Sequence, residues 1–384
     1  MKIAFLGCRK IPAEYGGLET IVEELSIRLT KKGYNIFVVF PSDKFSQDIY
    51  KGITRVHFPT FFKSHLTIPI IGDIIGTLYL TIKHYNDIDI YFYTNTGGAI
   101  PAIFLRLMGK KVIINSDGVE WKRMEKRINF VPRYNKLIYY ITRNLLYFLE
   151  SLSCIISSVT IADSKAIKRY LEKKHNATRV THIAYGVRDL KSNKSIEKEK
   201  QILQNFGITP NEYYLTVSRI VAENNIDMEI EGFKISNSKK KLVIIGNFNE
   251  NDYYTKFLSK FKNNKNIIFL DSIYDAKVLG VIRKHCFAYI HSYEVGGTNP
   301  SLLEQMLFEK PILIYENEYN KEVIREGGIY FNDLYSLKKR INQIESKEFN
   351  FKNKINVYKE RINKIYNWGK ITEEYEQLFK YLEM

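Results

Sequence analysis

Apolar residues along the chain follow two periodicities that alternate. Short apolar runs typical of buried strands, such as Lys2–Leu6, are followed by segments with apolar residues at helical spacing, such as 18–31. In the first half this pattern predicts further strands at 35–40, 88–93, 111–115, 159–163 and 181–184, and helices at 99–107 and 164–174. The alternation of strand and helix is typical of a parallel, doubly wound sheet.

The second half repeats the same rhythm. It predicts strands at 213–218, 241–246, 266–270, 288–291 and 311–315, and helices at 226–236, 300–308 and 371–382. Between the halves, residues 191–200 are polar and charged with one apolar residue, which is the composition of a linker. We therefore expect an α/β protein with two doubly wound, Rossmann-like domains, at 1–188 and 189–364, the first completed by the C-terminal helix 365–384.

Composition agrees with two folded domains. The chain has 384 residues, 45% of them hydrophobic, which suits about two domains of ordinary size and excludes a disordered or collagen-like chain. Lys and Arg outnumber Asp and Glu by 58 to 42, a net charge of +16. This excess of positive charge either belongs to a solvated, lysine-rich surface or serves to attract nucleic acid, anionic lipid or phosphorylated substrates. The net charge alone does not distinguish between these explanations.

Cysteine usage and hydropathy favour a cytoplasmic protein. Cys8, Cys154 and Cys286 are too few and too scattered for a disulfide framework or a tetrahedral zinc site. The opening apolar run is too short for a secretory signal, and no stretch of about 18 residues is free of charge. We expect no membrane span, no metal and no cofactor.

Two segments at expected strand ends could bind an anion. Gly16 and Gly17 open the helix at 18–31, where bare backbone N–H groups can approach a phosphate. The alternative is that these glycines only shape a turn. Arg219 follows the strand at 213–218, and its guanidinium suits a bidentate grip on phosphate. The alternative for Arg219 is an ordinary surface residue.

A third segment, 295–304, joins a strand to a helix through a Gly-Gly turn. The backbone N–H groups expected to form an anion pocket here belong to Gly296, Gly297, Thr298, Asn299 and Ser301. Glu304 has two interpretations. It either accepts hydrogen bonds from a ribose hydroxyl, or it forms a capping box over Ser301.

These segments occur in a characteristic order. The motifs are Gly16-Gly17-x-Glu19, Asp117-Gly118-x-Glu120-Trp121-Lys122-Arg123, Ser218-Arg219-Ile220-Val221 and Gly296-Gly297-Thr298-Asn299-Pro300-Ser301-Leu302-Leu303-Glu304. Together they resemble the retaining GT-B glycosyltransferases of family 4, and within that family the bacterial rhamnosyltransferase-like group of capsule and cell-wall polysaccharide synthesis. The resemblance spans nearly the whole chain.

The resemblance implies a role for each of these positions. On the donor, it places Gly16 and Gly17 beside the diphosphate, Arg219 at the departing nucleotide diphosphate and Glu304 at the ribose. It places Asp117 near the transferred sugar, and Glu19 and Glu120 at hydroxyl groups of the acceptor. It implies no metal, because Arg219 and backbone N–H groups would neutralise the diphosphate. On this basis Arg219 and Asp117 are the expected catalytic residues.

The sequence departs from the family pattern at two positions. Gly296 stands where the first Glu of the E-x7-E motif belongs, and Glu294 is out of register. Asn224 stands where many family members have a Lys. The resemblance therefore favours a donor other than UDP-glucose or GDP-mannose, and we expect dTDP-rhamnose. A related transferase using a UDP- or GDP-hexose, or a non-catalytic binding protein on the same fold, remains an alternative.

The expected acceptor is a polyprenyl-diphosphate-linked saccharide at the inner face of the cell membrane. Trp121, Lys122, Arg123 and Arg127 mix aromatic and cationic character, which suits a peripheral dock on an anionic bilayer. The alternative is that the aromatic residues nearby pack the core of a long helix at about 135–152. No nucleic-acid-binding motif occurs in the sequence, so we do not expect a nucleic-acid partner.

Overall fold

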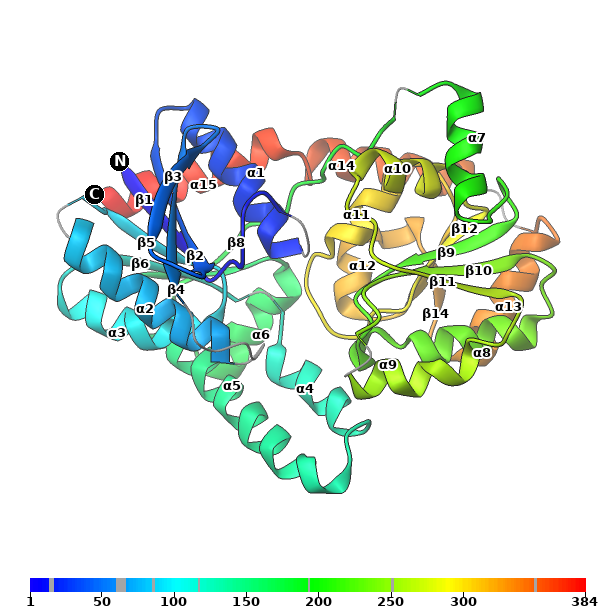
Figure 1. Ribbon diagram of the computed structural model, residues 1–384, viewed down its shortest axis with the longest axis horizontal. Coiled ribbons are helices and arrows are strands. Elements are labelled where there is room, and N and C mark those ends of the chain that lie inside the picture. The colour runs from blue at the N-terminus through cyan, green and yellow to red at the C-terminus, as the bar shows by residue number, and fades with distance from the viewer. Residues whose placement is uncertain are drawn as a thin grey trace. The chain divides into compact units, whose positions relative to one another are not determined.

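The computed structural model describes residues 1–13, 17–59, 67–84, 87–116, 118–192, 194–249, 252–348 and 351–384, with only the backbone of 67–69 (Figure 1). These residues divide into two units. The first unit comprises Met1–Trp121, Ile141–Gly186 and Asn367–Met384, and the second comprises Lys122–Tyr140 and Val187–Tyr366. The C-terminal residues 367–384 belong to the first unit, and residues 122–140, which the sequence analysis assigns to the first domain, group with the second unit.

The first unit contains a mainly parallel sheet. Its order across the sheet is β3 (Ser46–Tyr50), β4 (Ile53–Pro59), β2 (Asn35–Ser42), β1 (Lys2–Leu6), β5 (Ile90–Tyr93), β6 (Lys111–Ser116), β7 (Val159–Ala162) and β8 (Val180–His182). Ile3 of β1 pairs with Ile36 and Ile90 on the flanking strands. The pair β3 and β4 is antiparallel.

Helices cover both faces of the first sheet (Figure 1). They are α1 (Gly17–Lys31), α2 (Thr67–His84), α3 (Ala99–Leu107), α5 (Lys136–Ile156), α6 (Lys165–His175) and α15 (Trp368–Glu383), with η1 (Thr96–Gly98) as a single turn. Most of α4 (Glu120–Ile128) and all of the turn η2 (Arg133–Asn135) fall in residues 122–140, which group with the second unit. On one face Tyr91 and Tyr93 pack into a core that includes Leu105 of α3 and Leu149 of α5. On the other face the ring centroids of Phe92 and of Tyr375 on α15 lie 5.9 Å apart.

The second unit contains a wholly parallel sheet. Its order is β11 (Ile267–Leu270), β10 (Lys241–Ile245), β9 (Tyr213–Val217), β12 (Ala288–His291), β13 (Ile312–Tyr315) and β14 (Ile329–Phe331). Leu215 at the centre of β9 pairs with Val243 and Tyr289. The strands are buried on both faces, as the continuous apolar runs predict.

The helices around this sheet are α7 (Ile196–Asn205), α8 (Ile226–Ser236), α9 (Tyr253–Leu258), α10 (Ala276–His285), α11 (Pro300–Met306), α12 (Glu318–Ile324), α13 (Leu334–Glu345) and α14 (Lys352–Lys364), with turns η3 (Ala222–Asn224), η4 (Ser259–Phe261) and η5 (Arg325–Gly327). Phe233 of α8 and Leu337 of α13 share one core with Ile290 of β12. The fold class is therefore the expected one, with two Rossmann-like units.

The sequence analysis misinterprets the segment between the two halves. Residues 191–200 were expected to be a linker, but α7 begins at Ile196 with Ser195 as its N-cap. The reason is a buried ion pair, since the Glu199 carboxylate accepts from Lys284 Nζ at 2.7 Å and lies 2.9 Å from His285 Nε2. A charged residue that is paired in the interior looks like a solvated one in the sequence.

Apolar residues of α3 and α5 are unusually exposed. On α3, the side chain of Phe104 is 45% exposed and that of Leu107 is 84% exposed. On α5, Ile141 is 59% exposed and Phe148 is 58% exposed. The alternative that the aromatic residues of this long helix pack the core is therefore wrong for Phe148 and for Tyr140, which is 46% exposed. Among the described residues, no helix has the length and hydropathy needed to cross a membrane.

Candidate functional site

Two loops of the second unit meet at the carboxyl edge of its sheet. One follows β9 and the other follows β12, and these strands are neighbours in the sheet. The backbone N–H of Glu294 donates to the carbonyl of Glu223 at 3.1 Å, and Ser292 Oγ donates to the carbonyl of Asn224 at 2.7 Å. The carboxyl edge of an open parallel sheet is where such folds bind ligands, so these loops form the candidate site.

The first loop holds the backbone of Arg219 rigidly. Asn224 Nδ2 donates to the Arg219 carbonyl at 2.8 Å and to Ser218 Oγ at 3.0 Å, and Ser218 Oγ donates to the same carbonyl at 2.8 Å. Asn224 is buried and therefore has a structural role in this loop. The half-buried Arg219 guanidinium has no hydrogen bond or ion pair to any described residue, which leaves its donors available to a ligand.

The second loop supplies fewer free N–H groups than the sequence predicts. Asn299 is the N-cap of α11, and its side chain accepts from the Ser301 N–H at 2.9 Å. Ser301 Oγ is bonded to Tyr289 Oη and to the Val217 carbonyl, so both polar groups of Ser301 are engaged within the protein. Gly296 and Gly297 are partly exposed at the start of the loop, and Thr298 is buried.

Two arginines hold the Glu304 carboxylate. Arg283 Nη2 donates to Glu304 Oε2 at 3.0 Å, and Arg188 Nε donates to Oε1 at 3.2 Å. Arg283 is fully buried and also donates to the carbonyl and hydroxyl of Ser301. The capping-box interpretation of Glu304 is wrong, because Asn299 caps the helix. The sequence analysis missed Arg188 and Arg283, which carry no recognisable motif.

Residues 122–140, which we call the arm, bring further charged groups to the same loops. Arg127 Nε and Nη2 donate to the two oxygens of Glu223 at 3.0 and 2.5 Å, and Lys126 Nζ lies 2.8 Å from Glu294 Oε1. Arg123 is only 8% exposed. Arg123 and Arg127, which the sequence analysis assigns to a membrane dock, are thus buried or paired with a loop of the second unit, and the dock itself stays a prediction.

The charges around Glu223 outweigh the cost of burying its carboxylate. Burial by itself raises the pKa of Glu223, but the charge and hydrogen bonds of Arg127, and then the charges of Arg219 and Arg123, lower it below the ordinary value. Glu223 is therefore ionised at neutral pH although it is fully buried. This cluster of one carboxylate and three guanidinium groups is a strongly cationic environment.

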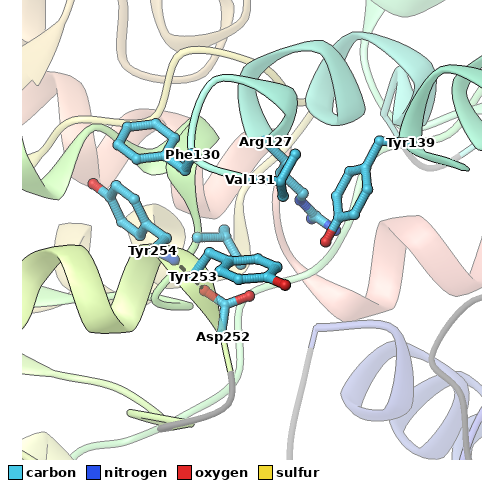
Figure 2. Close-up of a pocket in the computed structure, with 9 residues that line it drawn as sticks. Arg127, Phe130, Val131, Tyr139, Asp252, Tyr253 and Tyr254 are labelled. Carbon is cyan, nitrogen blue, oxygen red and sulfur yellow. Dashed lines mark hydrogen bonds between the residues drawn. The ribbon is translucent and has the colours of Figure 1, made fainter. Parts of the chain in front are cut away.

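A small pocket lies where the arm packs against the rest of the second unit (Figure 2). Its lining residues are Arg127, Phe130, Val131, Tyr139, Val221, Ala222, Asp252, Tyr253 and Tyr254. Phe130 faces Tyr254 edge-on, with ring centroids 4.8 Å apart, and Asn135 Nδ2 donates to Tyr253 Oη at 2.6 Å. None of the predicted donor-binding residues lines this pocket, so we assign it to packing of the arm.

The predicted residues of the first unit are only partly described. Gly16 and Asp117 lie outside the described residues. Gly17 begins α1, and Glu19 in its first turn is buried and accepts from the Arg9 N–H at 3.4 Å. Glu120 is the first residue of α4 and is half-buried. Trp121 Nε1 donates to Tyr170 Oη at 2.9 Å, which ties it to the first unit.

One buried carboxylate of the first unit was missed. Asp73 of α2 is 3% exposed, and its Oδ2 has no partner among the described residues. Burial raises the pKa of Asp73 well above its usual value, against a hydrogen bond from Asn95 that lowers it. A polar residue inside the apolar stretch of α2 was the available signal in the sequence.

Comparison with known families assigns each half of the chain. Residues 1–188 match a domain of unknown function, DUF1972, and residues 197–364 match the family described as glycosyl transferases group 1. Residues 197–364 are therefore similar to a group 1 glycosyltransferase domain. Arg219, Gly296 and Glu304 lie inside this domain, whereas Arg188 and the arm lie outside it. No curated protein sequence matches the chain.

Solved structures show the same overall fold. The chain is similar to sucrose-phosphate synthase from Thermosynechococcus elongatus, with 14% identity, a TM-score of 0.76 and coverage of 99% of this chain and 98% of that one. It is also similar to Anabaena Alr3699/HepE in complex with UDP-glucose, with 15% identity, a TM-score of 0.73 and 99% of both chains covered. The catalytic domain of Arabidopsis thaliana starch synthase IV, bound to ADP and acarbose, matches at 10% identity and a TM-score of 0.69, with 99% of both chains covered. The fold is GT-B.

Proposed function

We propose that this glycosyltransferase transfers L-rhamnose from dTDP-rhamnose to a polyprenyl-diphosphate-linked saccharide in surface polysaccharide synthesis, with retention at the anomeric carbon. The part of the proposal that concerns the donor rests on the position and bonding of Arg219. Its backbone is fixed by Asn224, and its guanidinium has no hydrogen bond or ion pair to the described protein, at the edge where a group 1 domain would hold a nucleotide sugar.

The proposed chemistry needs a stabilised leaving group and an oriented acceptor. When the bond between the anomeric carbon and the diphosphate oxygen breaks, the electron pair leaves with the nucleotide diphosphate. Arg219 would then donate to the developing negative charge, and preorganised donors of this kind contribute several kcal/mol. The acceptor hydroxyl attacks the anomeric carbon from the same face, and its proton passes to the oxygen of the departing diphosphate. Glu304, fixed by Arg188 and Arg283, would accept a hydrogen bond from the 3′-hydroxyl of the donor deoxyribose.

A second donor class has its own support. HepE, a structural relative at 15% identity, was solved with UDP-glucose. A UDP-hexose is therefore the alternative donor, and Gly296 in place of a family carboxylate is the argument against it. Thermal shift with dTDP-rhamnose, UDP-glucose and GDP-mannose separates the two, because a ligand at 100 times its Kd stabilises by about 2.7 kcal/mol.

Transfer assays with the stabilising donor and a polyprenyl-diphosphate-linked saccharide complete the test. Product formation with dTDP-rhamnose supports the proposal. Stabilisation by UDP-glucose alone favours the alternative donor. Donor binding without any turnover would support a non-catalytic binding protein instead. Steeply salt-dependent affinity for DNA or RNA, tighter than that for every nucleotide sugar, would contradict all three.

The acceptor side of the proposal includes a peripheral contact with the inner face of the cell membrane. Exposed apolar side chains of α3 and α5 support it. On α5, Ile141, Leu145, Phe148 and Ile155 recur on one helical face, and all are more than 40% exposed. The net charge of +16 favours an anionic bilayer.

Vesicle sedimentation tests this contact. The double variant Leu107→Glu with Phe148→Glu should release the protein from vesicles that contain anionic lipid. Tyr335→Glu, at a position that is 72% exposed on α13, is the matched control and should bind as the unaltered protein does. Equal binding of all three proteins would remove the membrane contact from the proposal.

A further inference from the structure

The arm carries an arginine to the second loop of the group 1 domain. Arg123 Nη2 lies 3.2 Å from the position that a Cβ atom would occupy at Gly296. A side chain at residue 296 would therefore crowd the guanidinium, and glycine leaves room for it. Arg123 is 8% exposed, so the cation is held inside the second unit.

Several independent contacts fix the arm in this position. Arg127 holds Glu223 with two hydrogen bonds, Lys126 pairs with Glu294, and Phe130 packs against Tyr254. Residues three and four apart share a face of a helix, so the anchors at 126 and 127 direct Arg123 toward the same loops. The position of Arg123 is thus set by its neighbours on α4.

The charges in this region favour an anion. Arg123, Lys126, Arg127 and Arg219 contribute four positive charges, and Glu223 and Glu294 contribute two negative ones. Arg127 is bonded to Glu223 in the loop that also carries Arg219, Arg123 lies beside Gly296, and the backbone N–H of Glu294 donates to the Glu223 carbonyl and so joins the two loops. A diphosphate carries two or more negative charges and accepts bidentate hydrogen bonds from arginine.

We propose that Arg123 binds the diphosphate of the donor together with Arg219, and that Gly296 provides the space for it. This inference rests on the proposed function, since it assumes a nucleotide-diphosphate donor. In this arrangement the first half of the sequence supplies a donor-binding residue that the group 1 domain lacks. The carboxylate expected at position 296 is replaced by a cation from the arm.

Isothermal titration with the diphosphate and monophosphate of one nucleoside tests the inference. The probes are dTDP with dTMP and UDP with UMP. Charged hydrogen bonds are strong enough that Arg123→Gln should lower affinity for the diphosphate about ten- to a hundredfold. Affinity for the monophosphate should change less than threefold. Arg133→Gln, at an exposed arginine of the same arm, is the charge-matched control and should change neither affinity.

A second variant tests the role of the glycine. Gly296→Ala should displace the guanidinium by a few tenths of an ångström and weaken diphosphate binding less than Arg123→Gln does. In the double variant, Gly296→Ala should add almost nothing to the effect of Arg123→Gln, because the two act on one contact. Additive effects would show that Gly296 acts without Arg123 and would overturn that part of the inference.

The outcomes separate this inference from the proposed function. If the unaltered protein binds diphosphates and Arg123→Gln keeps the ratio of diphosphate to monophosphate affinity, only the inference is overturned. A parallel loss of both affinities, with lowered stability, shows a purely structural role and also overturns it. If the unaltered protein binds neither diphosphate, the proposed function and this inference both fail.

Discussion

Arg127 donates to both carboxylate oxygens of Glu223, with Nε 3.0 Å from Oε2 and Nη2 2.5 Å from Oε1, and Glu223 is fully buried. The two residues are 96 positions apart in the sequence. This pair attaches the arm to the group 1 domain beside Arg219. A bidentate arginine–carboxylate pair restricts the orientation of both groups, so it also restricts the position of Arg123 one helical turn earlier.

Loss of Arg127 should destabilise the second unit. Arg127→Met leaves the Glu223 carboxylate buried without its main partner, which we expect to cost about 3 kcal/mol in the free energy of unfolding. Because Arg127 lowers the pKa of Glu223, this contribution is present at pH values above the ordinary glutamate pKa and is lost on acidification below it. Urea unfolding at pH 7 and pH 4 measures both effects. Arg133→Met is the control, and equal stabilities of the two variants at pH 7 would contradict the expectation.

Arg219→Ala should lower kcat by about two orders of magnitude if the guanidinium stabilises the leaving diphosphate. Arg219→Lys retains the charge but not the bidentate geometry and should retain part of the activity. Steady-state kinetics with the preferred donor measures this. Lys262→Ala, at an exposed cation of the same unit, should be unaffected. Near-normal turnover of Arg219→Ala would exclude Arg219 from the mechanism.

Glu304→Gln should weaken nucleotide binding about tenfold, because an amide is a poorer partner than a carboxylate for ribose hydroxyls. The discriminating readout is the nucleotide itself. dTDP should lose affinity on this substitution, whereas 2′,3′-dideoxythymidine diphosphate, which lacks the 3′-hydroxyl, should not. A loss of the same size for both nucleotides would mean that Glu304 only supports Arg188 and Arg283.

Glu229 should make stability depend on pH. Burial raises the pKa of Glu229 to about 7, and hydrogen bonds from Thr216 and Ser292 limit the shift. The unfolded chain ionises near pH 4.5, so the folded protein loses stability as the pH rises from 4.5 to about 7, by up to about 3 kcal/mol. Glu229→Gln should therefore be more stable relative to the unaltered protein at pH 8 than at pH 5. Urea unfolding at the two pH values checks this, and a difference that does not vary with pH would refute it.

Much of the fold follows from local pattern. The helices at 99–107 and 226–236 and the strand at 288–291 were predicted with the bounds that the structure shows, because apolar period and capping residues are local properties. The hairpin of β3 and β4 was missed. Its edge strand β3 is exposed and polar, so it carries no apolar alternation to recognise.

The charged residues of the site were harder to interpret. Arg123 and Arg127 look like a cationic surface in the sequence, yet they are held against Glu223 and Gly296. Arg283 has no motif, and its full burial against Glu304 and Ser301 depends on how α10 packs beside α11. A buried ion pair and a solvated one use the same residue types, so composition cannot separate them.

The sequence by itself determined the two α/β halves and the positions of Arg219, Gly296 and Glu304 at or after the ends of strands, because strand order and helical period are encoded in neighbouring residues. Tertiary structure alone decided which cations face the site. The arm groups with the second unit although it lies in the first half of the sequence, and the contact between Arg123 and Gly296 joins positions 173 residues apart. Such contacts depend on packing between distant segments, and no local pattern records them.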